Sequence, residues 1–262
     1  MPGTKLFYFS ATGNTLATAR QLAARLPDTT LERIDASGDA HAVHTDATKV
    51  GILFPVYCLD PAPPVLEFAR RLRLDRCDYA FAVATHNGDP GSALTVLDRA
   101  LARNGGALSA GWSLLMPGTS LHVVDYTNPP EERRARLDQA RHRIPEIAAA
   151  VEKGERHALE QRARFGERCK SRVNRTILTS VYPAQRHFQV EESCSGCATC
   201  ARVCPCGNVR LEAGRPSWGD DCVQCLACLH WCPRSAVQIG GHTQGKLRYH
   251  HPDIQVSDVA LR

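Results

Sequence analysis

The sequence lacks any stretch that could cross a membrane, since no run of about 18 apolar residues occurs in its 262 residues. The first residues, from Met1 to Lys5, also lack the charged start and the apolar stretch that form a secretory signal. We therefore expect a soluble, cytoplasmic protein with no membrane span.

Two kinds of nucleotide-binding loop and a strong charge imbalance are missing as well. The formal net charge is only +5, and acidic residues are interspersed along most of the chain, so charge gives no argument for nucleic acid as a partner. No G-x-G-x-x-G motif occurs, which argues against a nicotinamide-binding Rossmann unit. The glycine-containing loop near the N-terminus has no lysine, which argues against a nucleoside triphosphate.

Cysteine, in contrast, is abundant, with 12 residues of which nine fall between positions 194 and 232, and eight of these nine share a regular spacing. They form two copies of the spacing C-x2-C-x2-C-x3-C-P. A disulfide framework would need an oxidising compartment, and structural zinc sites use separated C-x2-C pairs rather than triplets followed by Cys-Pro. The doubled spacing instead indicates two iron-sulfur clusters. The two copies comprise Cys194, Cys197, Cys200 and Cys204, and Cys222, Cys225, Cys228 and Cys232.

The segment 188–240 resembles the bacterial ferredoxins that carry two 4Fe-4S clusters. In that pattern the first three cysteines of a motif bind one cluster and the fourth binds the other. The resemblance implies that cluster I is held by Cys194, Cys197, Cys200 and Cys232, and cluster II by Cys222, Cys225, Cys228 and Cys204. Cys206 is then an additional thiol near cluster II that is not a ligand.

The N-terminal segment reads as a strand, a polar loop and a helix. Lys5 to Phe9 is short and apolar, and Leu16 to Leu26 has the spacing of an amphipathic helix. The hydroxyl groups and the backbone N–H groups of the loop between them would form an uncharged cradle for an anion at the helix N-terminus. The alternative is a plain capped turn. The candidate residues are Ser10, Thr12, Gly13, Asn14 and Thr15.

Residues 7–15 resemble the phosphate loop of the flavodoxins, which implies that this cradle holds the phosphate of FMN. The following sequence alternates strands and helices, as that resemblance implies. We expect an α/β fold with a five-stranded parallel sheet of order 2-1-3-4-5. In such a sheet, a ligand lies beyond the carboxyl ends of strands 1, 3 and 4. The expected strands are 5–9, 31–35, 50–54, 79–85 and 108–116, with helices at 16–26, 64–72, 93–104 and 131–153.

In flavodoxins the loops after strands 3 and 4 hold the flavin ring. By this resemblance, Pro55, Val56 and Tyr57 contact one side of the ring, with Tyr57 as the stacking aromatic, and the loop containing His86, Asn87 and Gly88 contacts it through backbone groups. Two alternatives remain open from the residues themselves. Tyr57 could be an ordinary core aromatic, and His86 could be a surface histidine.

The chain is expected to have four parts, which are a flavodoxin-like domain at 1–153, a basic connecting segment at 154–187, a ferredoxin domain at 188–240, and a tail at 241–262 that docks on the body. Nine Lys or Arg against three acidic residues lie between Lys153 and His187. This basic run is either a solvated helix face or a docking patch for an acidic redox protein, which salt would weaken.

Nearly the whole chain is similar to the family in which a flavodoxin domain is fused to a two-cluster ferredoxin. The similarity includes the stretches 54–57, 225–233 and 248–252. It implies an FMN protein that carries low-potential electrons between its clusters, its flavin and a partner redox protein, with a homodimer as a possible form. The alternative is a reductase in which a small substrate reacts at the flavin. The sequence leaves this choice open.

Overall fold

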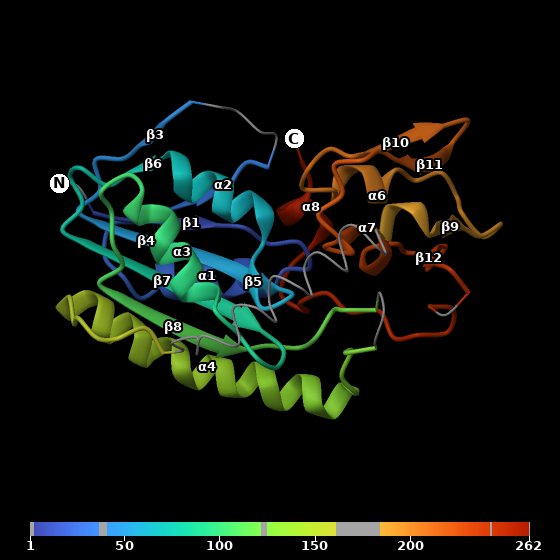
Figure 1. Cartoon of the computed structure of the whole chain (residues 1–262). Coiled ribbons are helices and arrows are strands. Elements are labelled where there is room, and N and C mark those ends of the chain that lie inside the picture. The colour runs from blue at the N-terminus through green and yellow to red at the C-terminus, as the bar shows by residue number, and fades with distance from the viewer. Residues whose placement is uncertain (1–2, 37–40, 122–124, 161–183, 242, 262) are drawn as a thin grey trace.

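Five parallel strands form the central sheet of the N-terminal part of the chain (Figure 1). The computed structural model describes residues 3–36, 41–121, 125–160, 184–241 and 243–261. The strands lie in the order β2-β1-β4-β7-β8, which confirms the expected flavodoxin order. Their bounds are β1 Thr4–Tyr8, β2 Thr29–Arg33, β4 Lys49–Tyr57, β7 Tyr79–His86 and β8 Ala110–Leu115.

The middle of this sheet is apolar because helices cover both of its faces. In β7, for example, seven successive residues from Tyr79 to Thr85 are buried, as a strand covered on both sides requires. Helices α2 (Pro63–Arg71) and α3 (Ala93–Ala102) pack together over one face. Helices α1 (Asn14–Ala23) and α4 (Pro130–Lys153) pack together over the other. The sheet is therefore doubly wound, and its carboxyl edge carries the loops of interest.

The sheet domain also contains short strands and one extended segment that the sequence did not predict. Strand β5 (Asp60–Pro61) pairs with β4, and β3 (Val43–His44) pairs with β6 (Leu72–Arg73). After α4 the chain runs along β8, because the N–H of Glu160 donates to Gly111 O at 2.9 Å. The backbone thus stays bonded to the sheet beyond residue 153, where we expected the domain to end. Most of the basic segment, residues 161–183, lies outside the described residues.

The C-terminal part is a small module built on paired strands (Figure 1). After the short helix η2 (Ala184–Arg186), β9 (Phe188–Val190) pairs antiparallel with β12 (Val237–Ile239), and β10 (Val209–Glu212) forms a hairpin with β11 (Arg215–Trp218). Single-turn helices α6 (Thr199–Arg202) and α7 (Ala227–His230) each contain the third cysteine of a triplet, and α8 (Val256–Val259) lies in the tail.

An apolar cluster joins the module and the tail to the sheet domain. It contains Leu16 and Ala17 of α1, Trp231 of the module, and Ile254 and Val259 of the tail, all nearly inaccessible to solvent. The two parts of the chain therefore share buried surface at the carboxyl edge of the sheet. None of the helices in the described part of the chain combines the length and the apolar character that a membrane span requires.

Candidate functional site

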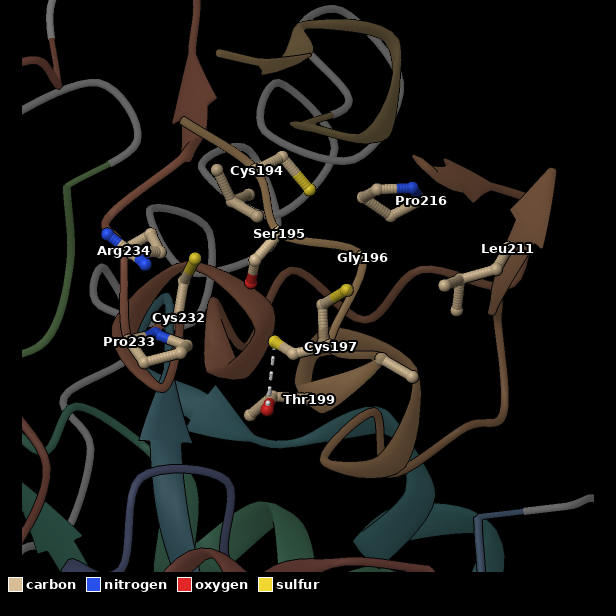
Figure 2. Close-up of a pocket in the computed structure, with 13 residues that line it drawn as sticks. Cys194, Ser195, Gly196, Cys197, Thr199, Leu211, Pro216, Cys232, Pro233 and Arg234 are labelled. Atoms are coloured by element: carbon tan, nitrogen blue, oxygen red, sulfur yellow. Dashed lines mark hydrogen bonds between the residues drawn. The ribbon is translucent and has the colours of Figure 1, made fainter. Parts of the chain in front are cut away.

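The first cysteine triplet and the last cysteine of the second motif surround one pocket. Cys194, Cys197, Cys200 and Cys232 all line it, together with the backbone of Ser195 to Thr199 and the hairpin β10–β11. Figure 2 shows this arrangement, with Cys194, Cys197 and Cys232 around the opening. The structure thus brings together the four residues that the resemblance assigned to cluster I, although they come from segments about 30 residues apart.

A second pocket collects the remaining motif cysteines. Its cysteines are Cys204, Cys206, Cys222, Cys225 and Cys228. The four residues expected to hold cluster II are therefore together, but Cys206 lines the same pocket. A cubane with four cysteine ligands needs only four of these five thiols.

The two motifs have the same unusual backbone. In each motif, non-helical residues with positive φ alternate with the cysteines, and such values are strained for side-chain-bearing residues. The last cysteine of each motif also accepts a backbone N–H from four residues on, at 3.3 Å for Cys204 and 3.2 Å for Cys232. Similar positive φ values recur at matching positions, and they are strained at the four residues that are not glycine, which is typical of a loop shaped around a bound group. The matched residues are Gly196 and Gln224, Ala198 and Leu226, and Gly207 and Ser235.

The chemistry of these thiols fits a bound cationic group. Burial raises the pKa of Cys222 to about 11 and that of Cys206 to about 12, and it also raises the pKa of Cys225 and of Cys228. Gathering buried thiolates without a positive centre is unfavourable, and iron bound to the sulfurs removes that penalty. Among the described residues, no group of three or more Cys, His, Asp or Glu could hold a single metal ion. Four thiols around a multi-iron cluster need not converge as ligands of one ion do.

The second pocket lies against the expected flavin-ring loop. Val223, between two of its cysteines, packs against the same apolar core as Val56 and Tyr57. Burial raises the pKa of Tyr57 well above its ordinary value, and the neighbouring Cys225 and Cys206 raise it further. Tyr57 therefore lies between the carboxyl edge of the sheet and the second set of cysteines.

The expected phosphate loop begins directly after β1 and ends at the N-terminus of α1. Gly13, the residue before the helix, has φ 97°, a conformation that glycine adopts readily. The Oγ atom of Ser10 accepts the N–H of Leu16 at 3.2 Å, and the hydroxyl groups of Thr15 and Thr85 lie 2.8 Å apart. Asn14 uses its side chain within the fold, because its Nδ2 donates to Pro117 O at 3.0 Å. Its contribution to an anion site is thus limited to its backbone N–H.

The last residue of β7 has a polar side-chain atom without a hydrogen-bond partner. Nδ1 of His86 is buried and forms no hydrogen bond, and burial lowers the pKa of this histidine. A Cβ atom placed on Gly88 would meet no atom within 4 Å, so the chain leaves open space there. Asn87 is fixed by a bond from its Nδ2 to Tyr126 O at 3.2 Å. A ligand at this edge could therefore approach the backbone of residues 86–88, as expected for a flavin ring.

The facing loop is a tight turn between β4 and β5. Pro55 lies opposite Thr85 in the sheet, and the strand then turns back through Cys58 and Leu59, whose φ values are 52° and 70°. This turn is in close contact with the loop after β7, because a Cβ atom on Gly91 of that loop would lie only 2.4 Å from Leu59 Cβ. The two expected ring-binding loops are thus packed against each other.

Several residues at this site were not among the predicted binding residues, although Trp231 and Tyr249 lie in the stretches 225–233 and 248–252 that carry the family resemblance. Arg33, at the end of β2, is partly buried beside Cys225 and Cys204, and its Nη2 atom has no hydrogen-bond partner. The indole of Trp218 lowers the pKa of Cys228 against the larger effect of burial. Trp231 and Tyr249 contact the expected phosphate loop directly, through bonds to Ala11 O at 2.9 Å and to Asn14 Oδ1 at 2.7 Å.

No protein-family model matches the chain, and no curated protein matches it. Among solved structures, the rubredoxin oxygen:oxidoreductase of the anaerobe Desulfovibrio gigas shares 17% identity over 58% of this chain, with a TM-score of 0.33, and the match spans only 37% of that protein. A flavoprotein in complex with FMN from Lactobacillus acidophilus NCFM shares 15% identity over 43% of this chain and 93% of its own, with a TM-score of 0.34. A flavone reductase shares 11% identity over 84% of this chain and 85% of its own, with a TM-score of 0.40. The flavodoxin-like fold itself rests on the strand order described above.

Proposed function

We propose that this protein is an iron-sulfur flavoprotein that transfers low-potential electrons between two 4Fe-4S clusters and FMN, and serves a partner redox enzyme as an electron carrier. The observation that carries the proposal is the place of the second cysteine set. Its Val223 packs on the same core as Tyr57, in the loop expected to hold the flavin ring. A redox group bound by these cysteines would be next to the flavin site.

Each proposed cofactor has residues that suit it. Cluster I would be held by Cys194, Cys197, Cys200 and Cys232, and cluster II by Cys222, Cys225, Cys228 and Cys204. FMN would be held by the loop from Ser10 to Thr15, by Pro55 to Tyr57, and by His86 to Gly88, where an unpartnered Nδ1 and open space are available. When bound, FMN supplies chemistry that couples one-electron donors to two-electron acceptors.

The first cysteine set provides the contact with solvent. Cys197 is an exposed residue, whereas Cys225 and Cys228 of the second set lie against or within apolar clusters. A Thr199 hydroxyl 3.4 Å from Cys197 Sγ lowers the pKa of that thiol, so the outer site favours its charged form. We therefore propose that cluster I, which is nearer to solvent, exchanges electrons with a partner protein. Cluster II then exchanges electrons with the flavin.

The ligand assignment is tested by replacing Cys204 and Cys206 separately with serine, as two matched variants from one pocket. Anaerobically reconstituted protein should contain about eight iron and eight sulfide per chain. We expect Cys206→Ser to leave both contents unchanged and Cys204→Ser to lower them. Loss of iron from Cys206→Ser with full iron in Cys204→Ser would show that Cys206 is the fourth ligand of cluster II. Low iron in the unmodified protein would refute the clusters themselves.

A further inference from the structure

The phosphate loop is held from outside by the C-terminal half of the chain. Nε1 of Trp231 donates to the carbonyl of Ala11 at 2.9 Å, and the backbone N–H of His251 donates to the carbonyl of Thr12 at 2.9 Å. Both donors are nearly inaccessible to solvent. Two successive carbonyl groups of the loop are therefore directed toward the module and the tail.

Turning these carbonyls outward sets the direction of the neighbouring N–H groups. In a planar trans peptide the N–H points opposite to the C=O. The N–H groups of Thr12 and Gly13 therefore point away from Trp231 and His251. The N–H groups of Asn14 and Thr15 follow them in the first turn of α1, where no intrahelical acceptor exists. Consecutive N–H groups gathered on one side of a loop form a nest for an anion.

The outer side of the loop is closed by the same residues. A Cβ on Gly13 would lie 3.0 Å from both His251 Cβ and Ile254 Cβ, so the tail is already in contact there. The hydroxyl of Tyr249 donates to Asn14 Oδ1 at 2.7 Å and holds the first residue of the helix. An anion can therefore approach these N–H groups only from the side that faces away from the tail.

Trp231 and His251 together form a clamp on the loop, and further contacts fix this clamp in place. The ring of Trp231 stacks on the ring of His250 with centroids 4.0 Å apart and planes 13° apart. Farther along the tail, Asp258 pairs with Arg20 of α1 at 2.6 Å. Trp231 also directly precedes Cys232, the residue that links the second motif to the first pocket. A residue that bonds to the loop and a residue that lines the first cysteine pocket are thus adjacent in the chain.

We propose that Trp231 and the tail segment 249–254 are positioning elements that orient the N–H groups of the loop toward a phosphate monoester, and so make the protein select FMN over riboflavin. This inference rests on the proposed function, because it concerns the phosphate end of the same flavin. It adds that the iron-sulfur module takes part in binding the flavin.

The test compares affinities for FMN and riboflavin in cluster-loaded protein from which flavin has been removed, by anaerobic fluorescence titration. Trp231→Phe removes the indole N–H but keeps a ring for His250. We expect it to weaken FMN binding about three- to tenfold, as the loss of one orienting hydrogen bond would, and to leave riboflavin binding unchanged. Tyr249→Phe should act in the same direction. Trp112→Phe, in β8 and in the core on the α1–α4 side of the sheet, is the matched control and should change neither affinity.

The outcomes separate the two proposals. An unchanged ratio of FMN to riboflavin affinity in both Trp231→Phe and Tyr249→Phe would overturn the positioning role while leaving FMN binding intact. If Trp231→Phe loses iron, its flavin affinities no longer report on the loop alone. The ratio of affinities in Tyr249→Phe then decides whether the positioning role holds, because Tyr249 lies outside the cysteine motifs in the sequence. Failure of the unmodified protein to bind either flavin would instead refute the proposed function, and the inference with it.

Discussion

His251 shows how one buried side chain ties the tail to the loop and makes the contact sensitive to pH. It is 1% exposed, and its Nδ1 accepts the N–H of Asp253 at 3.2 Å, which requires the neutral ring. Burial lowers its pKa from 6.5 to about 4, with Asp253 opposing the change and Arg141 and His250 adding to it. The folded state therefore binds this proton less readily than the unfolded state.

The sign of the pH effect follows from that difference. The contribution of neutral His251 to the stability of the folded protein is fully present above about pH 6.5. It is lost as the pH falls toward about 4, and the total loss in free energy of unfolding is roughly 3 kcal/mol. His251→Asn keeps an acceptor for Asp253 but cannot titrate. We expect the melting temperature of the cluster-loaded protein to fall more steeply between about pH 7.5 and about pH 5 than that of the variant. Parallel curves would contradict the burial of a neutral His251.

At the scale of elements, the loop between β1 and α1 should bind phosphate through hydroxyl and N–H groups without a charged side chain. Removing the hydroxyls with Thr12→Ala and Thr15→Ala should release FMN, since each hydrogen bond to a charged group contributes about 1.5 to 3 kcal/mol. The iron content should stay the same, because neither residue lines a cysteine pocket. The flavin retained after gel filtration is the measurement. Full retention in the double variant would remove this loop from the site.

The same elements show what the sequence could and could not predict. The apolar runs were enough to predict the strands, because buried parallel strands have such runs, whereas the order of the strands followed from the resemblance to flavodoxins. The doubled motif was enough to group its eight cysteines in two sets. Cys206 was predicted to lie near cluster II, and it lines the second pocket. The clamp of Trp231 and His251 depends on tertiary contacts between residues far apart in the chain, which no local pattern encodes.

At the scale of the whole molecule, the identity of the partner depends on the basic segment, most of which lies outside the described residues. If this segment docks an acidic redox protein, replacing Arg162, Arg164 and Arg168 with Glu should slow electron exchange through the association rate. The rate for the unmodified protein should fall steeply with salt, and the rate for the variant should change little. Stopped-flow mixing at several ionic strengths measures both. Equal rates at every ionic strength would indicate a solvated segment and would favour a small substrate at the flavin over a protein partner.

The central claim is that two clusters and one flavin act together in a single chain. An anaerobic reductive titration of the fully loaded protein, followed by optical and electron paramagnetic resonance spectra, tests it most directly. We predict uptake of about four electron equivalents per chain, one for each cluster and two for FMN. Uptake of about two equivalents, with signals from the flavin alone or from the clusters alone, would contradict the account.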